Sequence, residues 1–243
     1  MPLFTYGTIL QSVQDACTQL NLSTPTGVYD SRDEHAVLMG SYANMIGPML
    51  VDNYQWQQFD DTFEVIGDGV QVAYPLPDDY ARFTEDTGWS HANRRPVVIV
   101  NSQQQAAIQA WISNSFFINP AVILENDGLN FLVAPALGER ITFKYSSKNW
   151  AIDGTDPATK KYRMDNNADT PMFDSVLFTF ALKLKWAEAR GMPTAAYQAD
   201  FNGRLDQTYG KNAMAQTLSL NGGVGSGWKY LDASNIPDTG IGI

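Results

Sequence analysis

The sequence predicts an α+β protein in which a four-helix bundle carries an inserted β-rich domain and an extended C-terminal arm. Apolar residues recur at helical spacing near both ends of the chain, and the alternating spacing of strands fills its middle. The last 25 residues contain six glycines, a composition that cannot build a core of its own. The predicted parts are a discontinuous helical bundle domain in residues 1–59 and 151–218, a β-rich domain in residues 60–150, and an arm in residues 219–243.

The first two helices are predicted from apolar spacing and from the residues that flank it. One helix is expected over residues 5–21, and it ends at the stretch NLSTPTGVYD, whose proline and glycine break regular structure. The second is expected to begin with a capping box formed by Ser31 and Glu34, and to continue to about residue 56 or 59. Gly47 and the proline after it predict a kink in this helix.

The middle of the chain is predicted to consist mainly of strands. The stretch FEVIGDGVQVAYPLP indicates two strands around a turn at residues 67–69, and Asp127 with Gly128 indicates a hairpin further on. The stretch SQQQAAIQAWISNS indicates a short helix or an irregular edge. A β-rich segment between helical segments is the pattern of an insertion.

Two more helices are predicted after a polar linker. Thr170 is expected to cap the third helix and Pro171 to occupy its first position. The fourth is expected over residues 194–218, after a Gly-Met-Pro break. Four helices can then pack together with the β-rich part projecting from them.

The arm carries isolated apolar residues that could anchor it in a groove of a neighbouring protein. A simply disordered tail is the alternative. The candidate partner-binding or portal-binding residues are Trp228, Tyr230, Leu231, Ile236, Ile241 and Ile243.

Composition restricts the function classes. The formal net charge is −10, which argues against a protein that grips nucleic acid, because phosphate contacts need clustered Lys and Arg. Charged residues make up only 17% of the chain, which favours an oligomer with covered surfaces. Cys17 is the single cysteine, so no disulfide can form within the chain. Without a basic leader or a run of about 18 apolar residues, the expectation is a product made in the cytoplasm with no membrane segment.

The patterns of catalytic and metal sites are weak throughout. His35 and His91 are the only histidines, and neither lies near a nucleophile motif. Asp165, Asn167 and Asp169 have the spacing of a calcium loop, but its glycine and its terminal glutamate are missing. We therefore expect no catalytic residues, no metal and no cofactor. The acid pairs at residues 60–61 and 78–79 are expected to be solvated surface charges. The basic clusters at residues 94–95 and 160–163 are expected to be solvated loop charges or partners for a neighbour's carboxylates.

Several stretches taken in order resemble the head-to-tail adaptor (connector) proteins of short-tailed bacteriophages. They are ACTQLNLSTP, YQWQQF, YPLPDDYARF, TGWSHANRRPV, SQQQ, FKYSSKNW and LKLKWAEARGM. The resemblance spans roughly residues 8–200 and does not include the arm. It implies a structural virion protein that forms a twelve-fold ring between the portal protein and the tail nozzle protein. It implies that DNA passes through the channel of this ring without specific binding.

Two alternatives stay open at this stage. One is a virion-associated hydrolase of cell-wall glycan that binds sugar through Trp89 and Trp111, since aromatic rings can stack on sugars. The other is a different tail component, such as a nozzle or stopper protein. A zymogram distinguishes the first from an adaptor, and the identity of the partner distinguishes the second.

The stretch FKYSSKNWAIDG is the candidate joint between the two domains. Phe143 and Tyr145 lie on one face of a predicted strand, and a serine pair ends it. Trp150 is expected to pack where the β-rich insertion returns to the helices. The three residues are therefore predicted to hold the two parts at a fixed angle.

Overall fold

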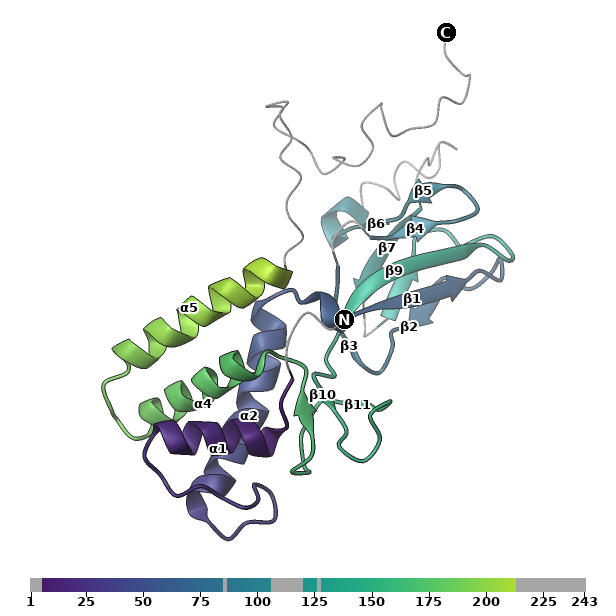
Figure 1. Ribbon diagram of the computed structural model, residues 1–243. Coiled ribbons are helices and arrows are strands. Elements are labelled where there is room, and N and C mark those ends of the chain that lie inside the picture. Colours follow the sequence, from purple (N-terminus) through teal and green to yellow (C-terminus); the bar gives the residue numbers. More distant parts are fainter. Residues whose placement is uncertain (1–5, 85–86, 106–119, 126–127, 213–243) are drawn as a thin grey trace.

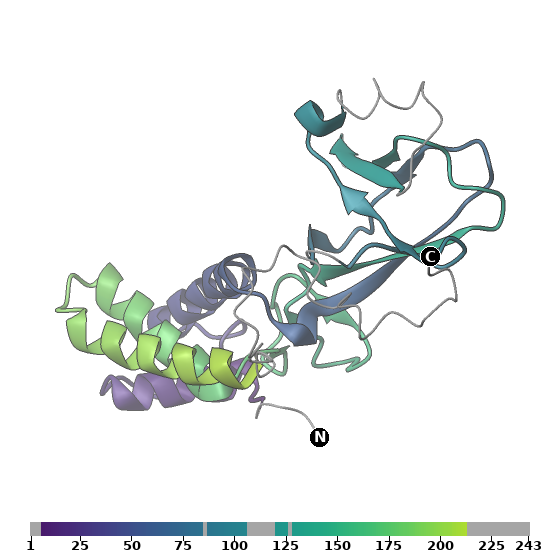
Figure 2. The same cartoon turned by 90° about the horizontal axis from the view of Figure 1, so that it is seen from above.

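A computed structural model describes residues 6–84, 87–105, 120–125 and 128–212. Helices form one side of the molecule, two sheets form the other, and a small third sheet lies where the two sides meet (Figure 1). Seen from above, the helices and the two larger sheets lie side by side (Figure 2). Within the described ranges, every helix is too short or too polar to cross a membrane.

The first three predicted helices are shorter than predicted, and the predicted end of the fourth, at residue 218, lies outside the described residues. They are α1 (Ile9–Gln19), α2 (Glu34–Asn53), a 3₁₀ turn η1 (Gln57–Phe59), α4 (Ser175–Ala189) and α5 (Ala195–Asn212). The cap of α2 is Asp33, whose side chain accepts a hydrogen bond from the amide of His35. Ser31 instead accepts from the amide of Asp33 at 2.9 Å, so the predicted capping box is wrong.

The third predicted helix starts later than expected. Its cap is Asp174, which accepts from the amide of Leu177. Thr170 and Pro171 form the strand β12 instead, because they pair with a strand about 20 residues earlier in the chain. Local capping signals at Thr170 are overridden by this long-range pairing.

The strands form three sheets. The first has the order β1 (Asp60–Ile66), β9 (Arg140–Ser147), β4 (Trp89–Ser90) and β5 (Arg95–Pro96), with β3 (Tyr80–Phe83) also paired to β9. The second has the order β2 (Ala73–Pro75), β8 (Gly128–Phe131), β7 (Ala121–Glu125) and β6 (Val98–Ile99). The third has the order β11 (Lys160–Lys161), β10 (Ala151–Ile152) and β12 (Thr170–Pro171).

The predicted hairpin is confirmed, and the two strands predicted around the turn at residues 67–69 are present but do not pair with each other. β7 and β8 pair antiparallel, with Leu124 opposite Leu129. β1 and β2, in contrast, lie in different sheets. The amides of the turn between them bond to a different segment: Gly67 donates to the carbonyl of Glu139, and Gly69 donates to the carbonyl of Pro135.

The predicted fold class is wrong, because the helices do not form a bundle with a core of their own. The structure is a mixed α/β protein with three sheets, and the third sheet and η1 share the core of the helices. Besides residues of α1, α2, α4 and α5, this core contains Val28, Trp56, Phe59, Trp150, Ala151, Met164, Met172 and Phe173. A separate core lies between the two larger sheets and contains Val65, Val97, Val122, Leu129, Phe131, Ile141 and Phe143.

Candidate functional site

The three predicted joint residues follow one another along the segment that runs from the core of the larger sheets to the core of the helices. Phe143 is buried in the core between the larger sheets, with its ring 5.3 Å from that of Phe83. Tyr145 follows on the same face of β9, at the end of the strand that is nearer the helices. Trp150 is fully buried in the core that the helices share with the third sheet. The segment therefore joins one core directly to the other.

Asp79 holds the end of β9 in place. Its carboxylate accepts hydrogen bonds from the hydroxyl of Tyr145 at 2.9 Å and from that of Ser147 at 2.6 Å. Its backbone carbonyl accepts from the amide of Lys148 at 2.7 Å. Burial, followed by the hydrogen bond to Asp79, raises the pKa of the Tyr145 phenol above its ordinary value, so the hydroxyl keeps its proton. We call this set of residues the Asp79 clamp.

Arg82 links the sheets to the end of a helix. Its two terminal nitrogens, Nη1 and Nη2, donate to the carbonyls of Asp52 at 2.7 Å and Tyr54 at 2.5 Å. These carbonyls lie at the C-terminal end of α2, where the helix leaves acceptors unsatisfied and where its dipole favours a cation. α2 has no basic residue in its own last turn. A side chain from β3 therefore completes this helix end across the joint.

Trp150 fills the space between α2 and α4. A Cβ added to Gly47 of α2 would lie 2.2 Å from atom Cε2 of the Trp150 ring, so only glycine allows this contact. The indole nitrogen donates to the carbonyl of Tyr162 at 2.7 Å, and the ring stacks on Phe178 at a centroid distance of 6.2 Å. The glycine that predicted a kink in α2 thus serves the packing of a tryptophan.

The chain enters and leaves the larger sheets at adjacent places. Asp60, the first residue of β1, lies opposite Ser146 of β9. Just before it, Phe59 packs its ring 5.2 Å from that of Phe173, and Gln58 donates to the carbonyl of Met172 at 3.0 Å. Both crossings are therefore tied to the same part of the helical core.

Two of the carboxylates in the calcium-like pattern, those of Asp165 and Asp169, bind the ammonium group of a lysine. The ammonium group of Lys161 lies 2.8 Å from a carboxylate oxygen of Asp169, 2.5 Å from one of Asp165 and 3.5 Å from one of Asp153. Asn167 instead accepts hydrogen bonds from the amide of Val28 at 2.7 Å and from the next amide in the chain. Among the described residues, no group of three or more His, Cys, Asp or Glu side chains could hold a metal ion.

Asp169 is the most buried carboxylate of this cluster, with a side chain that is 0% exposed. Burial by itself raises the pKa of Asp169, but hydrogen bonds from Lys161 and from the amides of Gly154, Asn166 and Asp165 outweigh it and hold the pKa below its ordinary value. For Lys161, burial acts to lower the pKa, and the hydrogen bonds to Asp165 and Asp169 raise it above its ordinary value. The cluster is therefore an ion-pair network that links β11 to the residue just before β12.

The two histidines and Trp89 have partners other than the residues of the Asp79 clamp. The ring of His35 packs against Trp186 at 5.2 Å, and the Nε2 atom of His91 lies 3.0 Å from the hydroxyl of Thr142. Trp89 is half-buried in β4. Trp111 and all six arm residues, from Trp228 to Ile243, lie outside the described residues.

The sequence did not reveal the roles of Asp79 and Arg82. The acid pair at residues 78–79 predicts solvated charges, yet Asp79 binds three groups of the joint, and no pattern in the sequence singles out Arg82. The available signal was weak, because the stretch PLPDDYARF indicates only a polar turn followed by the short strand β3 and gives no sign of its partners. Only the pairing of β3 with β9 brings these residues together.

Replacing Asp79 with Ala is expected to lower the free energy of unfolding by about 2 kcal/mol, because it leaves the hydroxyls of Tyr145 and Ser147 without their acceptor. Amide hydrogen exchange at residues 145–148 should speed up more than exchange within either core. Asp78→Ala is the matched control, since Asp78 is the exposed neighbour. Equal exchange rates in both variants would show that the clamp does not hold the joint.

Comparisons with known proteins add no family to this picture. No protein-family model matches the sequence, and no curated protein matches it either. The resemblance to head-to-tail adaptors rests on the stretches quoted above and stays a prediction.

Proposed function

We propose that this chain is a structural virion protein, a head-to-tail adaptor that forms a ring between the portal protein and the tail nozzle protein of a short-tailed bacteriophage. The ring encloses the channel through which DNA leaves the capsid. The ordered resemblance of residues 8–200 to such adaptors is the origin of the proposal. A twelve-fold ring is the arrangement that this resemblance implies.

The braced joint is the observation that carries the proposal furthest. A connector has to transmit force between two neighbours without bending, and this chain places its two cores on either side of a short, heavily bonded segment. Asp79 fixes the strand end, Arg82 fixes the end of α2, and Trp150 fixes the return to the helices. The Arg82 bonds run from the first sheet to the end of α2, so bending the joint would break them, while the Asp79 and Trp150 bonds hold the connecting segment at its two ends.

The charge of the chain also supports this function. A ring of copies with a formal net charge of −10 each would repel the phosphates of DNA, and DNA would slide through it without adhering. A basic lumen in direct contact with DNA would contradict this part of the proposal.

Electron microscopy of the purified chain mixed with the portal protein of its phage tests the function. We expect an additional ring below the portal in the averaged particles. A chain that ends after residue 218 should show weaker attachment, because the apolar residues of the arm would tie each subunit to a second partner. A zymogram on cell-wall glycan, run with the same preparation, distinguishes an adaptor from the alternative hydrolase.

Two results would contradict the proposal in different ways. If neither the full chain nor the shortened chain binds the portal, the adaptor function is wrong. If both bind with equal affinity, the adaptor function stands and the role of the arm is wrong.

A further inference from the structure

β1 is an edge strand of the first sheet. It pairs with β9 over seven residue pairs without a register shift, and no other strand among the described residues pairs with it. Long edges of this kind are usually protected by a lysine, a proline or a bulge, because an open edge can pair with another extended segment. β1 has none of the three. It is therefore a place where a further strand can be added.

The backbone of β1 presents hydrogen-bonding groups at this edge. In an antiparallel pair, the amides and carbonyls of alternate residues point toward the partner strand and away from it. Gly67 donates to the carbonyl just before β9, so the odd-numbered residues of β1 point toward β9. The amides of Thr62, Glu64 and Ile66 therefore point outward. The carboxylate of Asp61 accepts from the first of these at 2.7 Å, and the other two lie at the far end of the strand.

The side chains of β1 determine what an added strand has to carry. On one face Val65 is buried, and Phe63 is half-buried against the core of the larger sheets. On the other face Glu64 is exposed, and Ile66 is 63% exposed. Neighbouring strands are stabilised by apolar pairs and by pairs of opposite charge. A matching strand therefore has large apolar residues on one face, with a cation and then an apolar residue on the other.

The arm contains a stretch with this pattern. Its four residues alternate two rings with a cation and an aliphatic side chain: Trp228, Lys229, Tyr230 and Leu231. A strand parallel to β1 with Lys229 beside Glu64 brings opposite charges together, and Lys229 is the only Lys or Arg in residues 213–243. The two rings of this strand then lie beside Phe63 and Val65, and its leucine covers Ile66.

The arm begins close to the start of β1. The C-terminal end of α5 points toward the sheets in both views (Figures 1 and 2), and the ring of Tyr209 lies 5.8 Å from that of Tyr54 and 6.1 Å from that of Trp56. Asp60 follows four residues after Trp56, at most about 14 Å of chain. Trp228 lies 16 residues beyond the end of α5, up to about 50 Å when extended. The arm of the same copy therefore reaches β1, and the shared chain raises its effective concentration there.

The β1 strand of a second copy is a poorer partner for this edge. The charged residues of β1 are all acidic, namely Asp60, Asp61 and Glu64. Pairing two such strands brings like charges together, which destabilises the pair. The edge therefore favours a strand that carries a cation.

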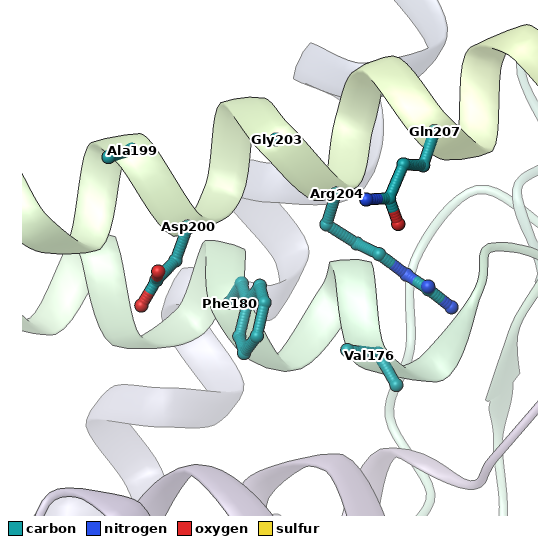
Figure 3. A pocket seen from close by; sticks show the side chains of 7 residues that line it. All are labelled: Val176, Phe180, Ala199, Asp200, Gly203, Arg204 and Gln207. Atoms are coloured by element: carbon teal, nitrogen blue, oxygen red, sulfur yellow. The ribbon is translucent and has the colours of Figure 1, made fainter.

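A groove between α4 and α5 is a second place for the arm to lie. It has a volume of about 370 Å³, and its lining includes Val176 and Phe180 beside Asp200 and Arg204 (Figure 3). The backbone groups of helices bond within the helix. The groove therefore offers an extended segment contacts with side chains, whereas β1 offers backbone hydrogen bonds as well.

We propose that residues 228–231 of the arm add to the first sheet as a strand parallel to β1 of the same copy. The added strand bonds to the outward amides of Glu64 and Ile66, and Lys229 binds the carboxylate of Glu64. The pairing fixes the middle of the arm along the sheet, and the last 12 residues, with Ile236 and Ile241, continue from there toward a partner. The inference goes beyond the proposed function, because it concerns this chain alone and is tested without the portal.

Amide hydrogen exchange followed residue by residue with NMR tests the pairing. The amides of Glu64 and Ile66 should exchange at least tenfold more slowly in the full-length chain than in a chain that ends after residue 218. The amides of Phe63 and Val65, which bond to β9, are the internal control and should change much less. Equal exchange at the two edge amides in both chains, whether fast or slow, would overturn the inference.

A charge swap tests the register. Lys229→Glu should speed exchange at Ile66 at least tenfold, because it places two carboxylates side by side. Adding Glu64→Lys to this variant should restore the protection. Asp238→Lys is the matched control, since it changes the charge of the arm outside the paired stretch and should have no effect. A double variant that stays unprotected would contradict the pairing.

Two further measurements separate the other arrangements. Tenfold dilution should leave the protection unchanged, because the arm and the edge belong to one copy; loss of protection on dilution would show that the arm comes from a neighbour. Gly203→Leu fills the α4–α5 groove from a position with nothing within 4 Å and should also leave the protection unchanged. Loss of protection in this variant would place the arm in the groove. Either loss would overturn the inference.

Discussion

Trp150→Ala is expected to lower the free energy of unfolding by about 3 kcal/mol, the largest effect of any substitution at the joint. The ring is 0% exposed and lies between α2 and α4. Removing it leaves a cavity against Gly47, which offers no side chain to fill the space. It also leaves the carbonyl of Tyr162 without its indole donor.

Urea unfolding followed by circular dichroism measures this loss. Trp150→Phe is the conservative comparison, because it keeps an aromatic ring while losing the hydrogen bond to Tyr162 and part of the indole that packs on Gly47, so its loss should be smaller than that of the alanine variant. Trp89→Ala is the second comparison, since Trp89 is only half-buried. An alanine variant at Trp150 that unfolds at the same urea concentration as the wild-type chain would show that this ring does not hold the helical core together.

Asp169→Ala is expected to cost about 3 kcal/mol, a typical loss when one partner of a buried ion pair is removed. The Asp169 side chain is 0% exposed, and Lys161, at 18% exposure, faces it at 2.8 Å. The substitution also leaves the amides of Gly154, Asp165 and Asn166 without an acceptor. Asp165→Ala is the matched control, because Asp165 contacts the same lysine but is 78% exposed, and its loss should be below about 1 kcal/mol.

The contribution of Asp169 should depend on pH in a defined direction. Its pKa is lower in the folded chain than the ordinary value of 3.8. The group therefore adds stability at pH values above about 4, and this stability is lost as the pH falls through the folded pKa. Lys161 acts in the opposite sense: its pKa is raised above 10.5, so its contribution is complete below that pH and is lost only as the pH rises through the higher folded value.

Urea unfolding of the wild-type chain and of Asp169→Ala at pH 6 and at pH 3 checks this direction. The difference between the two chains should be larger at pH 6. A difference that stays constant or grows at pH 3 would contradict the assignment of Asp169 as the charged partner.

The sequence predicts elements well where the signal is local and fails where distant segments decide. The apolar spacing predicted the helices, and the residue pair Asp127 and Gly128 predicted the β7–β8 hairpin, because both signals depend on residues close together in the chain. Thr170 and Pro171 have the residues of a helix start, yet they pair with Ala151 and Ile152. The fold class failed for the same reason, because no local pattern reveals that a small sheet shares the core of the helices.

The candidate site shows the same division. The aromatic residues of FKYSSKNW suggested a joint from their order alone, and Trp150 lies in the helical core. Asp79 and Arg82 could not be found this way. The hydrogen-bond partners of Asp79 lie at least 66 residues away in the chain, and those of Arg82 at least 28. Patterns in a single sequence do not reveal contacts at such separations.

The adjacent crossings between the two cores also set an order for folding. The helical core contains residues from Ile9 to Leu205, so the chain cannot complete it until nearly all of the described segment has been synthesised. The pairing of β1 with β9, in contrast, lies within residues 60–147. Once this pairing has formed, Phe59 lies close to residue 147, where the chain returns to the helices. Completing the helical core then no longer carries the entropy cost of closing the loop between these two points. We therefore expect the β-rich part to form before the helical core and to bring the two halves of that core together.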